Sequence, residues 1–168
     1  MIDIYSAGPQ TNRVRFVMLL SLASAIGACW AGWDLSQTFG LNPGDGGVLA
    51  PVDVRLAWGL GVAGLGLAFA AAMWLYGRLY IRTIQFDRVA KLLHVRTLGM
   101  FGDRTIAFPA TDVLRSTFLA GQLYNPFGVS VNAPWYNLWV SGRRWPFILD
   151  AQGVSSEPQL LERLLKSR

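Results

Sequence analysis

The sequence predicts a membrane protein of the α+β class, in which a two-helix transmembrane hairpin precedes a small antiparallel β domain closed by a C-terminal amphipathic helix. Two apolar runs, residues 16–33 and 56–76, contain no charged residue. At about 1.5 Å of rise per residue, helices over these runs would be about 27 and 31 Å long, close to the roughly 30 Å hydrocarbon core of a bilayer. After the second run, short segments rich in β-branched and aromatic residues alternate with turn residues, which indicates strands.

The composition agrees with this division of the chain. Hydrophobic residues make up 52% of the 168 residues and charged residues 15%, which is more apolar than an ordinary soluble domain. About ninety residues follow the second run, enough for one small domain with a single core. We expect a tail at the membrane surface over residues 1–15, a hairpin over 16–77 with its loop at 34–55, and a cytoplasmic β domain with a C-terminal helix over 78–168.

Small residues recur every four positions in both expected helices, the first of which can be capped by Thr11 or Asn12. Rows of this kind let helix backbones approach closely in lipid. We expect the two helices to pack on each other, and other small residues leave surface for a second row to meet an external partner. The candidate packing residues are Ala23, Gly27 and Ala31 in the first helix and Gly64, Ala68 and Ala72 in the second, with further smooth surface at Gly59, Gly61 and Gly66.

The charge distribution predicts the orientation of the hairpin. The loop 34–55, rich in glycine and proline, is expected to be irregular and exposed, and it carries three aspartates against one arginine. Most lysines and arginines follow Gly77, and such residues are retained on the cytoplasmic side. Both termini are therefore expected in the cytoplasm. The net charge of +5 then reflects topology and contact with anionic lipids, and no nucleic-acid motif is present.

Two alternatives concern the first apolar run. Arg13 and Arg15 before an apolar stretch also fit a secretory signal peptide, but the run is long for one, ends in Trp30 and Trp33, and would leave the second span alone if removed. The first fifteen residues lack the composition of a mitochondrial transit peptide. The sequence therefore favours a bacterial inner membrane.

Aromatic and basic residues gather at the ends of the expected spans. An indole or phenol ring can be buried there while its polar atom stays wet, and arginines follow in the head-group layer. The residues expected at the membrane interface are Trp30, Trp33, Trp58, Trp74, Tyr76, Arg78 and Arg82.

The segment after the hairpin predicts a β domain. Strands are expected at about residues 80–86, 91–97, 104–108, 113–118, 129–131, 137–141 and 145–149. Hairpin turns are expected at 87–90 and at 141–144, where Gly142 supplies a positive φ angle. An amphipathic helix over 156–166, with a capping serine and four leucines on one face, should close the domain. Seven strands followed by a helix are typical of a pleckstrin-homology-like barrel.

The chain offers few groups for catalysis or for holding a cofactor. It has one histidine, one cysteine and ten scattered acids, from which no catalytic constellation can be assembled. Cys29 is expected to be a packing residue, and His94 an ordinary strand residue. Neither span contains a histidine to ligate haem or chlorophyll, or a charge for an ion pathway. We therefore expect a protein that is not an enzyme and holds no cofactor or metal.

An aromatic-rich segment at 123–139 is interrupted by asparagines and prolines, so it cannot be one continuous strand. Its rings could fill the domain core, lie on the membrane surface or dock a partner. The candidate partner contacts, including two arginines of the following turn, are Tyr124, Phe127, Trp135, Tyr136, Arg143 and Arg144.

The stretch Val-Ser-Gly-Arg-Arg-Trp-Pro-Phe-Ile-Leu-Asp at 140–150, followed by Gly153, together with the two spans, resembles the transmembrane protein 223 family. The resemblance implies a bacterial relative of two-span mitochondrial inner-membrane proteins associated with cytochrome c oxidase assembly, without catalytic residues to carry over. Pro146 and the length of the 123–139 segment depart from the expected pattern and leave the partner open. By implication, residues 142–144 form a turn that either presents two guanidinium groups to a partner or lipid, or is simply solvated.

Two functions follow as hypotheses. The first is a non-catalytic accessory or assembly subunit of a large energy-transducing membrane complex, either a respiratory oxidase or a photosynthetic reaction centre with its light-harvesting antenna. Its helices would pack laterally against other integral membrane subunits, and its β domain would cap the cytoplasmic face. The alternative is a membrane-anchored lipid-sensing or scaffolding module with a pleckstrin-homology-like domain. This module would bind anionic head groups through Arg78, Arg82, Arg143 and Arg144.

Overall fold

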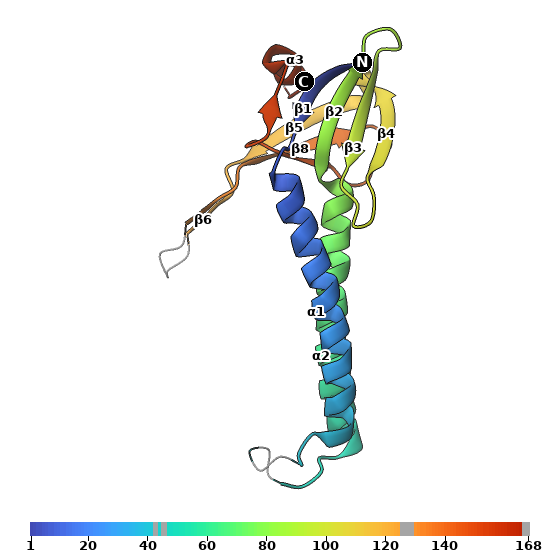
Figure 1. Ribbon diagram of the computed structural model, residues 1–168, viewed down its shortest axis with the longest axis vertical. Coiled ribbons are helices and arrows are strands. Elements are labelled where there is room, and N and C mark those ends of the chain that lie inside the picture. Colours follow the sequence, from blue (N-terminus) through green and yellow to red (C-terminus); the bar gives the residue numbers. More distant parts are fainter. Residues whose placement is uncertain (42–43, 45–46, 125–129, 166–168) are drawn as a thin grey trace. The chain divides into compact units, whose positions relative to one another are not determined.

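The computed structural model describes residues 1–41, 44, 47–124 and 130–165 (Figure 1). The chain forms two compact units. We call the unit Phe16–Leu75 the helical unit, and the unit made of Met1–Arg15 and Tyr76–Arg168 the β domain.

The helical unit contains most of two long helices, α1 (Gln10–Thr38) and α2 (Val52–Leu79). Their most apolar windows have mean hydropathies of 1.7 and 1.8, and only 17% and 6% of the residues in these windows are buried. A core helix of a soluble protein would be mostly buried. The expected pair of long apolar helices is thus confirmed, and both are long and apolar enough to cross a membrane.

The first residues form a strand, which corrects the expected surface tail over 1–15. Strand β1 (Ile2–Ser6) pairs antiparallel with β2 (Ile81–Asp87) and with β10 (Val154–Ser155). Ile4 and Tyr5 are 1% and 2% exposed. Its pairing partners lie far away in the sequence, so no neighbouring strand marked this segment as half of a hairpin.

Antiparallel sheets make up the β domain, as Figure 1 shows. One sheet has the strand order β10-β1-β2-β3-β4, a second has β5-β8-β9, and a third pairs β6 with β7. An isolated parallel bridge joins Tyr80 to Ile148. The remaining elements are β3 (Leu92–Thr97), β4 (Arg104–Pro109), the short 3₁₀ helix η2 (Ala110–Asp112), β5 (Val113–Leu119), β6 (Gln122–Tyr124), β7 (Ser130–Asn132), β8 (Trp135–Val140), β9 (Phe147–Asp150) and α3 (Pro158–Leu165).

Each of the seven expected strands corresponds to a strand of the structure, while β1, β6 and β10 were missed. Strand β9 begins at Phe147 instead of residue 145, directly after Pro146, which has no N–H to donate to a ladder. The antiparallel sheets and the C-terminal helix are confirmed. The pleckstrin-homology-like topology stays a prediction.

Both expected hairpin turns are present. The Asp87 carboxylate accepts hydrogen bonds from the backbone N–H groups of Val89 and Ala90 at 2.9 and 3.1 Å. These bonds lower the pKa of the Asp87 carboxyl. In the second turn Gly142 has a φ of 74°, the left-handed conformation expected of it.

The core of the β domain is built from the inward faces of the strands and from α3. Phe108 of β4 and Phe147 of β9 stack with ring centroids 6.1 Å apart. Leucines of α3 and buried residues of both larger sheets line one small cavity, so α3 covers the core as expected of its apolar face. The residues around this cavity are Ile84, Leu93, Val95, Val113, Leu138, Leu149, Leu161, Leu164 and Leu165.

One testable consequence concerns Gly153, because a Cβ added there would overlap the buried ring of Tyr5. We expect Gly153→Ala to lower the free energy of unfolding by about 1–3 kcal/mol, as overpacking does. Circular dichroism melting in detergent measures the change. Gly102→Ala is the matched control, since a Cβ at Gly102 meets no atom within 4 Å. Equal melting of both variants and the unaltered protein would refute the tight packing of Gly153.

Candidate functional site

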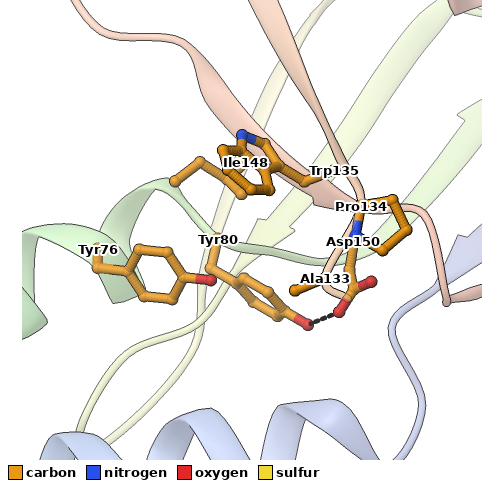
Figure 2. Close-up of a pocket in the computed structure, with 7 residues that line it drawn as sticks. All are labelled: Tyr76, Tyr80, Ala133, Pro134, Trp135, Ile148 and Asp150. Atoms are coloured by element: carbon orange, nitrogen blue, oxygen red, sulfur yellow. Dashed lines mark hydrogen bonds between the residues drawn. The ribbon is translucent and has the colours of Figure 1, made fainter. Parts of the chain in front are cut away.

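The β domain contains a pocket of about 240 Å³ at the last turn of α2 and the paired strands β8 and β9 (Figure 2). We call it the aromatic pocket. It combines three aromatic rings and one carboxylate with apolar side chains. Its lining residues are Tyr76, Tyr80, Ala133, Pro134, Trp135, Ile148 and Asp150.

Local structure explains why these groups meet. Tyr76 and Tyr80 are four residues apart, which places them on one side of a helical turn, and the Tyr80 N–H donates to the Tyr76 carbonyl at 2.9 Å. Their ring centroids are 5.7 Å apart. Trp135 begins β8 and Asp150 ends β9, and the two are directly paired in the antiparallel register. Helix periodicity and strand register together therefore build the pocket.

Asp150 is held by hydrogen bonds to both its carboxylate and its backbone carbonyl. The Tyr80 hydroxyl donates to its Oδ2 atom at 3.2 Å, drawn as the dashed line in Figure 2. The Gln152 N–H donates to its Oδ1 atom at 2.8 Å, and the Tyr5 hydroxyl donates to its backbone carbonyl at 2.8 Å. Arg15, Arg82 and Arg96 form their ion pairs with Asp103 and not with Asp150.

Burial is the largest influence on the pKa values of the phenol groups around Asp150. It raises the pKa of Tyr5 and of Tyr80 above the usual range, and the nearby Asp150 charge raises both further. Both hydroxyls therefore keep their protons at neutral pH and can serve as the hydrogen-bond donors described above.

The pocket unites residues that the sequence had placed in different groups. Tyr76 was expected at the membrane interface and Trp135 at a partner contact, while Tyr80 and Asp150 were not candidates. The available signals were the four-residue spacing of the tyrosines and the position of Asp150 at the end of the 140–150 motif. Neither signal shows that the end of α2 and the end of β9 lie close together in space.

The other aromatic candidates lie elsewhere. Tyr136 follows Trp135 in β8, and its ring packs on Phe118 with centroids 5.0 Å apart. Tyr124 belongs to β6, but its side chain and the whole of Phe127 lie outside the described residues.

Arg82, expected among lipid head groups, takes part in an ion-pair cluster. The Asp103 carboxylate is only 9% exposed and pairs with Arg15 at 2.9 Å and with Arg82. Arg96 lies 4.0 Å away. This carboxylate lies close to arginines from the start of α1, from β2 and from β3, and so links the β3–β4 loop to all three elements.

The two arginines of the β8–β9 turn stack on different rings. Arg143 lies 4.0 Å from the ring centroid of Phe147, and Arg144 lies 5.8 Å from that of Trp145. Burial lowers the pKa of the Arg143 guanidinium, and the positive charges of Arg104 and Arg78 lower it further. Arg143 is therefore packed against the domain, and it lies in a positively charged environment.

In the helical unit, the contact between α1 and α2 uses small residues other than the predicted rows. A Cβ added at Gly32 would overlap the Gly59 carbonyl oxygen, and one at Gly59 would overlap the Gly32 carbonyl oxygen. A Cβ added at Gly66 would overlap the Ala28 Cβ atom. The two backbones therefore approach each other along the line through these glycines, where the lack of side chains permits it.

The predicted rows face away from this contact. A Cβ added at Gly27 or Gly64 would meet no atom of the neighbouring helix within 4 Å. Ala23, Ala68 and Ala72 are exposed and Ala31 is half-buried. Both sets of small residues have suitable spacing, and only the rotation of each helix decides between them. The expectation that the two helices pack on each other through these rows is therefore wrong.

The four tryptophan side chains of α1 and α2 are exposed. The exposed fractions of Trp30, Trp33, Trp58 and Trp74 are 74%, 69%, 56% and 47%. Arg78 is also exposed. Their location at a membrane interface stays a prediction.

The raised tyrosine pKa values predict alkaline sensitivity. The contribution of Tyr5 and Tyr80 to stability is complete below the ordinary tyrosine pKa of about 10 and is lost as the pH rises toward the higher folded-state values. We expect the melting temperature to fall above about pH 10, and to fall less steeply in Tyr80→Phe. Tyr136→Phe controls for the loss of a phenol outside the pocket. Parallel curves for all three proteins would contradict this prediction.

The glycine contact predicts a difference between two helix substitutions. Gly59→Val should separate the backbones of α1 and α2 and lower the melting temperature in detergent, because a side chain there overlaps the Gly32 carbonyl. Gly64→Val introduces the same side chain on the same helix where no atom of α1 lies within 4 Å, and should melt like the unaltered protein. The reverse order of the two melting temperatures would overturn the assigned contact.

Comparison with known proteins supports the resemblance seen in the 140–150 motif. The model of the TMEM70/TMEM186/TMEM223 protein family matches residues 4–166, which include parts of both units. No curated protein matches the chain. Because the match extends over nearly the whole sequence, the chain belongs to the TMEM70/TMEM186/TMEM223 protein family.

Proposed function

We propose that this protein is a non-catalytic accessory or assembly subunit of a large energy-transducing membrane complex. Membership of the family suggests an assembly factor for membrane complexes. The two apolar helices and the family together support a location in a membrane. The observation that carries the proposal is the pair of small-residue rows that lie outside the contact between α1 and α2.

Close packing is the reason why these rows matter. Lipid tails are as apolar as leucine, so helices associate in a membrane where small residues allow close backbone contact. The contact between α1 and α2 is made through Gly32, Gly59 and Gly66. Gly27 and Gly64 lie outside it, and their neighbours Ala23 and Ala68 are exposed. We assign these rows to helices of another subunit.

The proposal includes an orientation and a class of complex. The arginines that follow α2 favour both termini on the cytoplasmic side of a bacterial inner membrane, with the aspartate-containing loop 34–55 outside. The β domain then caps the cytoplasmic face of a respiratory oxidase or of a photosynthetic reaction centre with its antenna. Tyr136 and Arg144 are the proposed contacts of this cap. A non-catalytic role agrees with the single histidine and single cysteine of the chain.

The test is recovery of the protein from native membranes in a mild detergent. The unaltered protein should elute with a complex of much larger mass, and cross-linking mass spectrometry should identify the neighbouring subunit. Gly27→Val and Gly64→Val should shift most of the protein to the free form, because both fill rows proposed to meet that subunit.

Two controls make the result specific. Ile26→Val changes an exposed side chain of α1, and Leu65→Val one of α2, without filling a glycine position. Both should stay in the complex. A free monomer from membranes that express the unaltered protein at its natural level would refute the proposed function.

A further inference from the structure

We propose that the aromatic pocket binds the ammonium group of an amine-bearing phospholipid head group, such as ethanolammonium or choline. The pocket brings the rings of Tyr76, Tyr80 and Trp135 together with the Asp150 carboxylate. Aromatic faces attract cations through their quadrupoles, and this combination is used to recognise quaternary ammonium ligands. This inference goes beyond the proposed function and does not depend on any partner subunit.

The charge of Asp150 favours a cation. A carboxylate can accept about four hydrogen bonds, and its oxygens receive one from Tyr80 and one from Gln152. The ion pairs of Arg15, Arg82 and Arg96 are made with Asp103 and leave Asp150 aside. Either ammonium group would supply the missing positive charge, and ethanolammonium would also supply N–H donors for the carboxylate oxygens.

The end of α2 adds to this attraction. Tyr76 lies in the last turn of the helix, which ends at Leu79. The carbonyl end of a helix carries the negative pole of its macrodipole and stabilises nearby cations. The pocket therefore combines a full negative charge, a partial negative charge and aromatic faces.

The size of the pocket suits a small organic cation. A protein cavity of roughly 150 Å³ is sufficient to bind benzene. The aromatic pocket measures about 240 Å³. An ethanolammonium or choline group fits within this volume while the rest of the lipid remains outside.

The location of Tyr76 favours a lipid over other carriers of an ammonium group. It is the last residue of the charge-free apolar run 56–76, where a spanning helix enters the head-group layer. Phospholipid ammonium groups are abundant at this depth. A lysine side chain of a partner or a soluble amine would have to compete with them.

The experiment is a lipid titration of the full-length protein by native mass spectrometry from detergent. The probes are phosphatidylethanolamine, phosphatidylcholine and phosphatidylglycerol with identical acyl chains, of which the last has no ammonium group. We expect both amine lipids to bind the unaltered protein more tightly than phosphatidylglycerol does. Asp150→Asn should weaken amine-lipid binding about tenfold, which corresponds to about 1.4 kcal/mol for the lost charge contact.

Substitutions at Tyr76 test the aromatic wall separately from the carboxylate. Tyr76→Phe keeps the ring and should bind like the unaltered protein, whereas Tyr76→Leu should bind amine lipids several-fold more weakly. Asp112→Asn removes a carboxylate that does not line the pocket and should have no effect. Melting curves of all variants establish that they are folded, so that each binding result can be interpreted.

Three outcomes would overturn the inference. One is equal binding of amine lipids and phosphatidylglycerol by the unaltered protein. Another is unchanged amine-lipid preference in both Asp150→Asn and Tyr76→Leu. The third is binding of free ethanolamine or of a partner lysine, identified by cross-linking near Tyr76, without any preference among the lipids.

Discussion

The β domain depends on the hydrogen bonds that converge on Asp150. Tyr5 reaches its carbonyl across 145 positions of sequence, and Tyr80 reaches its carboxylate across 70. These bonds join the first strand, the segment that follows α2, and the last strand of the second sheet. Gly153 leaves room for the buried Tyr5 ring beside them. The same carboxylate lines the aromatic pocket, so one residue both joins distant parts of the domain and supplies the negative charge of the pocket.

A second constraint is the close approach of Gly32 and Gly59 in the helical unit. Once these glycines are in contact, the rotation of each helix about its axis is fixed. The direction in which every other row of small residues faces is then fixed as well. The rows through Gly27 and Gly64 then face outward. One packing choice therefore determines which surface a lipid or a neighbouring subunit can meet.

The sequence predicted those features that depend on local composition. Charge-free apolar runs marked both long helices, β-branched segments marked seven strands, and Gly142 marked a turn with positive φ. It missed β1 and β10 because each pairs with a segment that lies far away in the sequence. Strand β1 forms by pairing with the edge of β2, and β10 forms by pairing with the other edge of β1.

By itself the sequence determined the two apolar helices, the antiparallel sheets, the C-terminal helix and the family, because hydropathy, strand propensity and a short motif are properties of neighbouring residues. Only the tertiary structure decided which glycines join the helices, that Asp103 holds Arg82, and that Tyr76, Trp135 and Asp150 share a pocket. These features arise from helix rotation, strand register and contacts between distant segments. For each such contact the chain contains several glycine rows, charged pairs or aromatic rings of similar type. Packing over the whole fold selects among them.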